Sequence, residues 1–94
     1  RGLSMPKKVV SCEIEGQTLE AVNTWFGGLR LNLNGEKVGS FKPKIAPKKG
    51  VPAITAMVDL LGGRSSRIEV FVKATTHVRL KIHVDGVHVA GDAF

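Results

Sequence analysis

This chain of 94 residues, with 43% hydrophobic and 23% charged residues, has room for one folded domain with a single core. That composition excludes wholesale disorder, and no apolar run approaches the roughly 20 residues that a membrane-spanning helix requires. The formal net charge of +6 favours an anionic partner, although a basic balance also keeps a small protein soluble.

The cysteine content and the first residues bear on the origin of the chain. Cys12 is the single cysteine, so no internal disulfide can form. This favours a reducing compartment such as the cytoplasm and leaves an extracytoplasmic protein without disulfides as the alternative. Arg1-Gly2-Leu3-Ser4 before Met5 is typical of residues left by an expression vector. We therefore expect one domain over residues 5–94.

Residues 9–40 predict the first of two four-stranded units. Cys12 lies in an alternating apolar pattern, so we expect its side chain to face the core as a small apolar group. In residues 29–33 three leucines alternate with polar residues, which places the leucines on the inner face. Asn34-Gly35 follows and predicts a two-residue hairpin, because a type I′ turn needs positive φ at both central residues.

Residues 41–53 form a basic linker between the two units. Its three prolines argue against regular structure. Four lysines fall within eight residues of this linker: Lys42, Lys44, Lys48 and Lys49. Together with Arg64 and Arg67 these lysines are the candidate residues for binding a polyanion. The alternative is that the linker is a solvated loop whose lysines prevent aggregation at sheet edges.

Residues 54–91 predict the second unit, although its first segment is ambiguous. Residues 52–61 fit a short helix that begins at Pro52 and ends at Gly62-Gly63. They also fit a strand with Ile54, Ala56, Val58 and Leu60 on one face. The similarity of the two units favours the strand.

The clearest alternation of the chain runs from Val78 to Val84 and is followed by the turn signal Asp85-Gly86. A two-residue turn places Val84 opposite Val87, His83 opposite His88, and Ile82 opposite Val89. The valines and Ile82 are then expected on the core face, and both histidines on the other face together with Arg79 and Lys81.

The two units share one order of strands and turns, which predicts an internal repeat of about 35–40 residues. Eight short strands with regularly spaced turns predict an all-β fold, either a small antiparallel β-sandwich or a half-open barrel. The Asn-Gly and Asp-Gly hairpins at residues 34–35 and 85–86 also resemble those of the Fas apoptosis inhibitory molecules, which are eight-stranded sandwiches. That resemblance implies the same fold class.

Two aromatic residues are candidates for contact with a partner. Trp25 precedes two nearby glycines at the expected end of a strand, where it is either a core residue or an exposed anchor. Phe71 lies on the otherwise polar face of its strand, between Glu69 and Lys73. The ring of Phe71 is either covered by the other sheet or marks a contact with a second subunit.

Catalytic and metal-binding patterns are sparse. His83 and His88 are weak candidates for a zinc or copper site, because a stable site normally has a third or fourth ligand. Cys12 has no neighbouring base that would make it a nucleophile. The sequence contains no metalloprotease motif, nucleophile elbow, phosphate-binding glycine loop or paired-cysteine site, so we expect neither an enzyme nor a cofactor.

The sequence therefore predicts a non-enzymatic binding module. The expected partner is another protein, including a second copy of this chain that pairs through an edge strand or the Phe71 face. The alternative is electrostatic binding of nucleic acid or another polyanion through the lysine-rich linker.

Overall fold

The computed structural model describes residues 7–24, 28–41, 50–60, 62–74 and 78–94, and these residues form β-strands and turns without a helix. The first sheet contains β1 (Lys7–Ile14), β2 (Gln17–Thr24), β3 (Gly28–Leu33) and β4 (Glu36–Phe41). The second sheet contains β5 (Ile54–Asp59), β6 (Ser65–Ala74), β7 (Val78–Val84) and β8 (Val87–Gly91). The prediction of an all-β fold with two four-stranded units is confirmed, and residues 54–59 are a strand, as the similarity of the units indicated.

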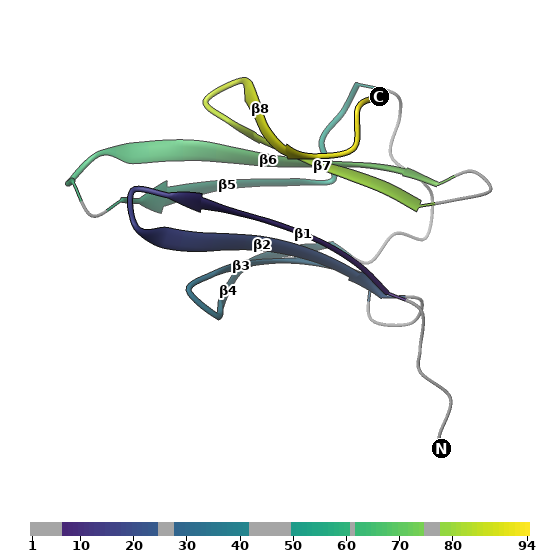
Figure 1. Cartoon of the computed structure of the whole chain (residues 1–94), viewed down its shortest axis with the longest axis horizontal. Helices are drawn as coiled ribbons and strands as arrows, with labels where there is room; N and C mark the ends of the chain where they lie inside the picture. Colours follow the sequence, from purple (N-terminus) through teal and green to yellow (C-terminus); the bar gives the residue numbers. More distant parts are fainter. Residues whose placement is uncertain (1–6, 25–27, 42–49, 61, 75–77) are drawn as a thin grey trace, which may run out of the picture.

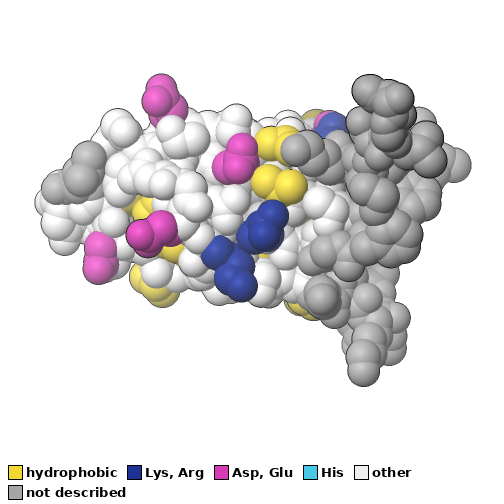
Figure 2. Space-filling view, turned by 90° about the horizontal axis from the view of Figure 1, so that it is seen from below, with side chains coloured by type: hydrophobic (Ala, Val, Ile, Leu, Met, Phe, Trp, Pro, Cys, Tyr) yellow, Lys and Arg dark blue, Asp and Glu magenta, His cyan; other side chains and the backbone are white. Residues whose placement is uncertain are grey.

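Each sheet is an antiparallel meander in which every strand pairs with its neighbours in the sequence, in the order β1-β2-β3-β4 and β5-β6-β7-β8. The two sheets lie face to face as separate layers (Figure 1). On the outer face of the first sheet, Lys or Arg side chains lie next to one another near the middle, hydrophobic side chains lie beside them, and Asp or Glu side chains are scattered (Figure 2). The architecture is therefore a two-layer sandwich in which no strand crosses from one sheet to the other.

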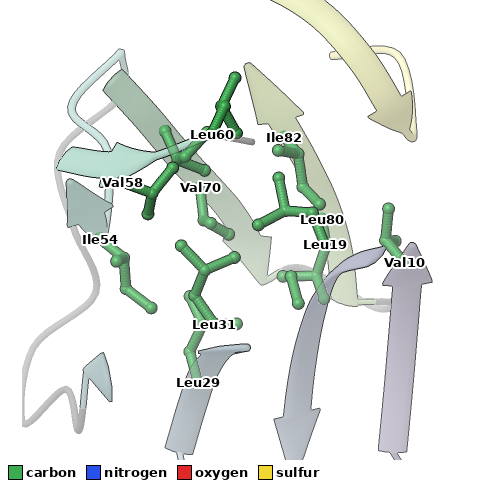
Figure 3. Packing of buried hydrophobic residues seen from close by; sticks show 12 residues of the cluster. Val10, Leu19, Leu29, Leu31, Ile54, Val58, Leu60, Val70, Leu80 and Ile82 are labelled. Carbon is green, nitrogen blue, oxygen red and sulfur yellow. The ribbon is translucent and has the colours of Figure 1, made fainter. Parts of the chain in front are cut away.

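The core lies between the two sheets and is filled by aliphatic side chains from both (Figure 3). Leu19 and Leu31 of the first sheet and Ile68, Leu80 and Ile82 of the second are fully buried. Burial of one such side chain contributes about 1.5–3 kcal/mol, so this shared core joins the two units. The buried cluster consists of Val10, Leu19, Ala21, Leu29, Leu31, Ile54, Val58, Leu60, Ile68, Val70, Leu80 and Ile82.

The two predicted hairpins have the conformation that their sequences require. Asn34 and Gly35 have φ values of 52° and 84°, and Asp85 and Gly86 have values of 50° and 85°. Glycine adopts this region freely, and Asn and Asp tolerate it better than other residues with a side chain. The Asx-Gly pairs therefore determine where β3 and β7 end.

The same Asx residues also bond to a third strand, and they do so identically in the two units. Asn34 Oδ1 accepts the Thr18 N–H at 2.9 Å, and the Asn34 N–H bonds to the Thr18 carbonyl at 2.8 Å. Asp85 Oδ1 accepts the Arg67 N–H at 2.9 Å, and the Asp85 N–H bonds to the Arg67 carbonyl at 2.8 Å. The internal repeat thus extends to single hydrogen bonds, with Asn34 and Asp85 in equivalent positions.

The last hairpin of each unit, β3–β4 and β7–β8, contains a shift of register. The shift in β7–β8 corrects part of the sequence prediction. His83 lies opposite His88 and Val84 opposite Val87, as predicted, but Ile82 lies opposite Ala90 rather than Val89. The shift between Ile82 and His83 leaves Val89 as an extra residue on β8, which is the pattern of a β-bulge. Val87 and Val89 are 63% and 41% exposed, so the expectation that these valines join the core was wrong.

Candidate functional site

The residues predicted to bind a polyanion are only partly described. Lys42, Lys44, Lys48 and Lys49 lie outside the described residues, so their role stays a prediction. Arg64 and Arg67 are exposed, but both are engaged: Arg64 pairs with Glu15 at 2.6 Å, and Arg67 Nε lies 3.5 Å from Glu69. The Arg64–Glu15 pair connects a loop of the second sheet to the β1–β2 turn.

Three rings that the sequence analysis assigned to separate functions meet on the outer face of the second sheet. Phe71 of β6 lies 4.8 Å from His83 of β7, measured between ring centroids, and the ring planes are inclined by 53°. His83 lies 5.7 Å from His88 of β8 at 43°. We call Phe71, His83 and His88 the ring row. Phe71 is half-buried here rather than packed between the sheets, and Trp25 lies outside the described residues.

The ring row places two imidazoles side by side without completing a metal site. Among the described residues, His, Cys, Asp and Glu side chains do not gather in any group of three that could hold a metal ion. Partial burial of His83 lowers its pKa below the usual 6.5. The charges of Lys81 and His88 lower this pKa further, and the charge of Glu69 opposes them. These effects favour the neutral form of the His83 ring, which suits stacking.

Lys81 and Phe94 extend the ring row, and the sequence analysis did not select them as site residues. Lys81 lies opposite Phe71 across β6 and β7. Its Nζ is 5.2 Å from the Phe71 centroid and 4.4 Å from the Phe94 centroid, and it also donates a hydrogen bond to the Phe94 backbone oxygen. The alternation of β7 already placed Lys81 on the histidine face, but the position of Phe94 depends on the tertiary fold.

Cys12 faces inward beside the core, as its alternation predicted. It is partly buried, and burial raises the pKa of its thiol. A raised pKa keeps the sulfur protonated at neutral pH, so Cys12 serves as a small apolar side chain.

The outer edges of the two sheets form a different kind of candidate surface. β4 and β8 pair with their neighbours through a register shift, and such bulges turn an edge away from further pairing. β1 pairs with β2, and β5 with β6, without any shift. The regular edges of β1 and β5 are therefore the described edges that are suited to receive another strand.

Comparison with known proteins returns no match: no family model, no curated protein and no solved structure matches this chain. Among the described residues there is also no helix with the length and apolar character needed to cross a membrane.

Proposed function

We propose that this protein is a non-enzymatic interaction module that associates with a second copy of itself through strand β1. The observation that carries the proposal is the regularity of this edge. β1 pairs with β2 over eight residues without a bulge, whereas β4 and β8 are interrupted. An unbulged edge strand presents a row of unpaired N–H and C=O groups that another strand can complete.

The turn geometry determines which backbone groups of β1 face outward. Glu15 and Gly16 form a two-residue turn with positive φ, so Ile14 and Gln17 are the hydrogen-bonded pair that closes it. Alternate residues from Ile14 backward then bond to β2. The intervening residues turn their N–H and C=O groups to the outer edge, where no other described backbone group bonds to them: Lys7, Val9, Ser11 and Glu13.

Among the antiparallel registers that a second copy of β1 can adopt on this edge, one uses all four outward residues. With the two-fold axis at Val10, Val9 lies opposite Ser11 of the other copy, and Lys7 lies opposite Glu13. All four outward residues of each copy then form backbone hydrogen bonds with the other copy. Such a contact is closed and self-complementary, as in most homodimers, and it joins the two first sheets into one eight-stranded sheet.

β5 is the rival edge, and its sequence is less suited to pairing. It has six residues, and Pro52, two residues before its first residue, has no N–H to donate. The alternative function, polyanion binding by the linker lysines, predicts affinity that falls steeply with salt. Hydrogen bonds between two strands have a much weaker dependence on salt.

The test is sedimentation equilibrium of the full chain over a wide range of concentrations, beside two proline variants. Ser11→Pro removes one N–H at the outer edge of β1 and leaves the bonds to β2 in place. Thr55→Pro is the matched control, because Thr55 lies in the equivalent outward position on β5. We expect a dimer for the parent and for Thr55→Pro, and a monomer for Ser11→Pro, with thermal unfolding showing that all three are folded.

A monomeric parent at every concentration contradicts the proposal, and so does a dimer that Thr55→Pro abolishes and Ser11→Pro retains. If Ser11→Pro does not fold, Glu13→Lys replaces it. That change adds positive charge to the pairing edge of a chain that already carries a net charge of +6, so it should weaken the dimer most at low salt. Glu20→Lys on the interior strand β2 makes the same change of charge away from the edge and should leave the dimer intact.

A further inference from the structure

A pair of like charges lies next to the ring row on the outer face of the second sheet. Lys73 of β6 lies directly opposite Arg79 of β7, and both side chains are exposed. Like charges in directly opposed positions destabilise a sheet. Within the described part of the chain neither residue forms an ion pair. The positive charge of Arg79 contributes to lowering the pKa of Asp92, but the Asp92 carboxylate forms its ion pair with Lys8 and accepts a hydrogen bond from the Leu80 N–H. Folding alone therefore gives no reason for this pair.

The strand register places these cations one step from the rings. Lys73 and Phe71 are two residues apart on β6, and Arg79 and Lys81 are two residues apart on β7, so both pairs share the outer face. One such step measures about 7 Å along a strand. The face thus presents a cation pair, then Phe71 beside Lys81, then His83 beside His88.

The first sheet provides an internal comparison, because the repeat assigns each of these positions a counterpart. Counted from the equivalent turns at Asn34 and Asp85, Phe71 corresponds to Val22, and the two histidines correspond to Asn32 and Lys37. The pair Lys73–Arg79 corresponds to Thr24–Gly28. The same fold is therefore built in the first unit without the ring row and without the cation pair.

From these observations we infer that the outer face of the second sheet binds single-stranded nucleic acid. A base stacks on the rings of Phe71 and His83, and an adjacent phosphate lies between Lys73 and Arg79. Aromatic side chains on a sheet hold unpaired bases by stacking, and Lys and Arg hold the phosphates. In a duplex the bases are stacked on one another, so their faces cannot reach the rings. This inference is independent of the dimer proposed above, since β1 belongs to the other sheet.

The experiment measures binding of labelled single-stranded DNA and RNA, a duplex of the same sequence, and heparin to the full chain by fluorescence anisotropy. Phe71→Leu keeps an apolar side chain and removes the ring, and we expect it to weaken single-strand binding about tenfold. The double variant Lys73→Ser with Arg79→Ser should make the fall of log affinity with log salt less steep, by about 1 in the slope. The matched control, Arg30→Ser with Lys37→Ser, removes the same charge from the first sheet and should change neither quantity by as much.

Several outcomes overturn this inference. One is binding that Phe71→Leu leaves unchanged, and another is equal or tighter binding of the duplex or heparin. A third is binding that disappears only when Lys42, Lys44, Lys48 and Lys49 are changed to serine, which assigns the affinity to the linker instead. Absence of any binding also overturns it. Measurement on Ser11→Pro separates the two proposals, because loss of the dimer should leave stacking on Phe71 intact.

Discussion

Gly39 allows β4 to approach β5 closely, and we expect Gly39→Ala to destabilise the protein. A Cβ added at Gly39 would lie 2.7 Å from Cγ2 of Ile54, a core residue that is only 4% exposed. Carbon atoms do not approach so closely, so a strand or the Ile54 side chain has to move. Forcing an extra methyl group into a packed core costs about 1–3 kcal/mol. Alanine also reduces the conformational entropy of the unfolded chain, which stabilises the folded state by about 0.4–1 kcal/mol.

The expected net loss is therefore about 1–2 kcal/mol, which for a domain of this length lowers Tm by about 4–16 °C. Backbone strain does not contribute, because the φ of Gly39 lies outside the left-handed region. Urea unfolding followed by circular dichroism measures the loss. Ser40→Ala, at the exposed neighbouring residue, is the control and should stay within about 0.5 kcal/mol of the parent.

A compensating substitution tests whether the contact with Ile54 is the cause. Leucine carries no branch at Cβ, so Ile54→Leu removes the atom that a Cβ at position 39 would meet, at a cost of under about 1.5 kcal/mol by itself. The double variant should therefore lose about 1 kcal/mol less stability than the sum of the losses of the two single variants. Full additivity, or a Gly39→Ala variant as stable as the parent, would show that β4 and β5 do not pack in this way.

Two further predictions concern the turns and the carboxylates that bond to the backbone. Asn34→Ala removes the acceptor for the Thr18 N–H and places alanine in the left-handed region, so we expect it to lower the free energy of unfolding in urea by about 2 kcal/mol. Asn34→Gly also removes the acceptor but adopts the same φ freely, so its expected loss is about 1 kcal/mol. Backbone N–H groups of Arg67 and Leu80 bond to the carboxylates of Asp85 and Asp92 and lower both pKa values below the usual 3.8. The folded state then binds fewer protons than the unfolded state, so the stability from these groups is present above about pH 4 and is lost as the pH falls through their folded pKa values. Asp85→Asn keeps the acceptor and should reduce the drop in stability between about pH 7 and about pH 3; an unchanged drop would exclude Asp85 as a source of it.

Local patterns predicted the strands and the two hairpins because their causes are local. Alternation with period two assigned the inner faces, including Leu31 and Leu80, since successive side chains of a strand point to opposite sides. The Asx-Gly pairs located the turns, since only a few residue types adopt positive φ without strain. For the ambiguous segment 52–61, comparison of the two units favoured a strand, and the structure confirms a strand over residues 54–59.

The candidate surfaces were less predictable, because they depend on contacts between strands. Opposition of His83 and His88 followed from a two-residue turn, but the bulge that brings Ala90 opposite Ile82 left no sequence signal that alternation could detect. The contact of Phe71 with His83 is diagonal across two strands, and it became visible only with the observed register.

The sequence by itself thus determined the all-β class, the inner faces of strands such as β3 and β7, and the position of the tight turns, since each depends on a few neighbouring residues. Only the tertiary structure decided which edges stay regular, which rings meet on one face and which charges are already paired. Those properties depend on register and on packing between residues far apart in the chain, as in the pairing of Glu15 with Arg64 or of Lys8 with Asp92. A one-residue shift in a strand changes every such contact while it leaves the local sequence pattern the same.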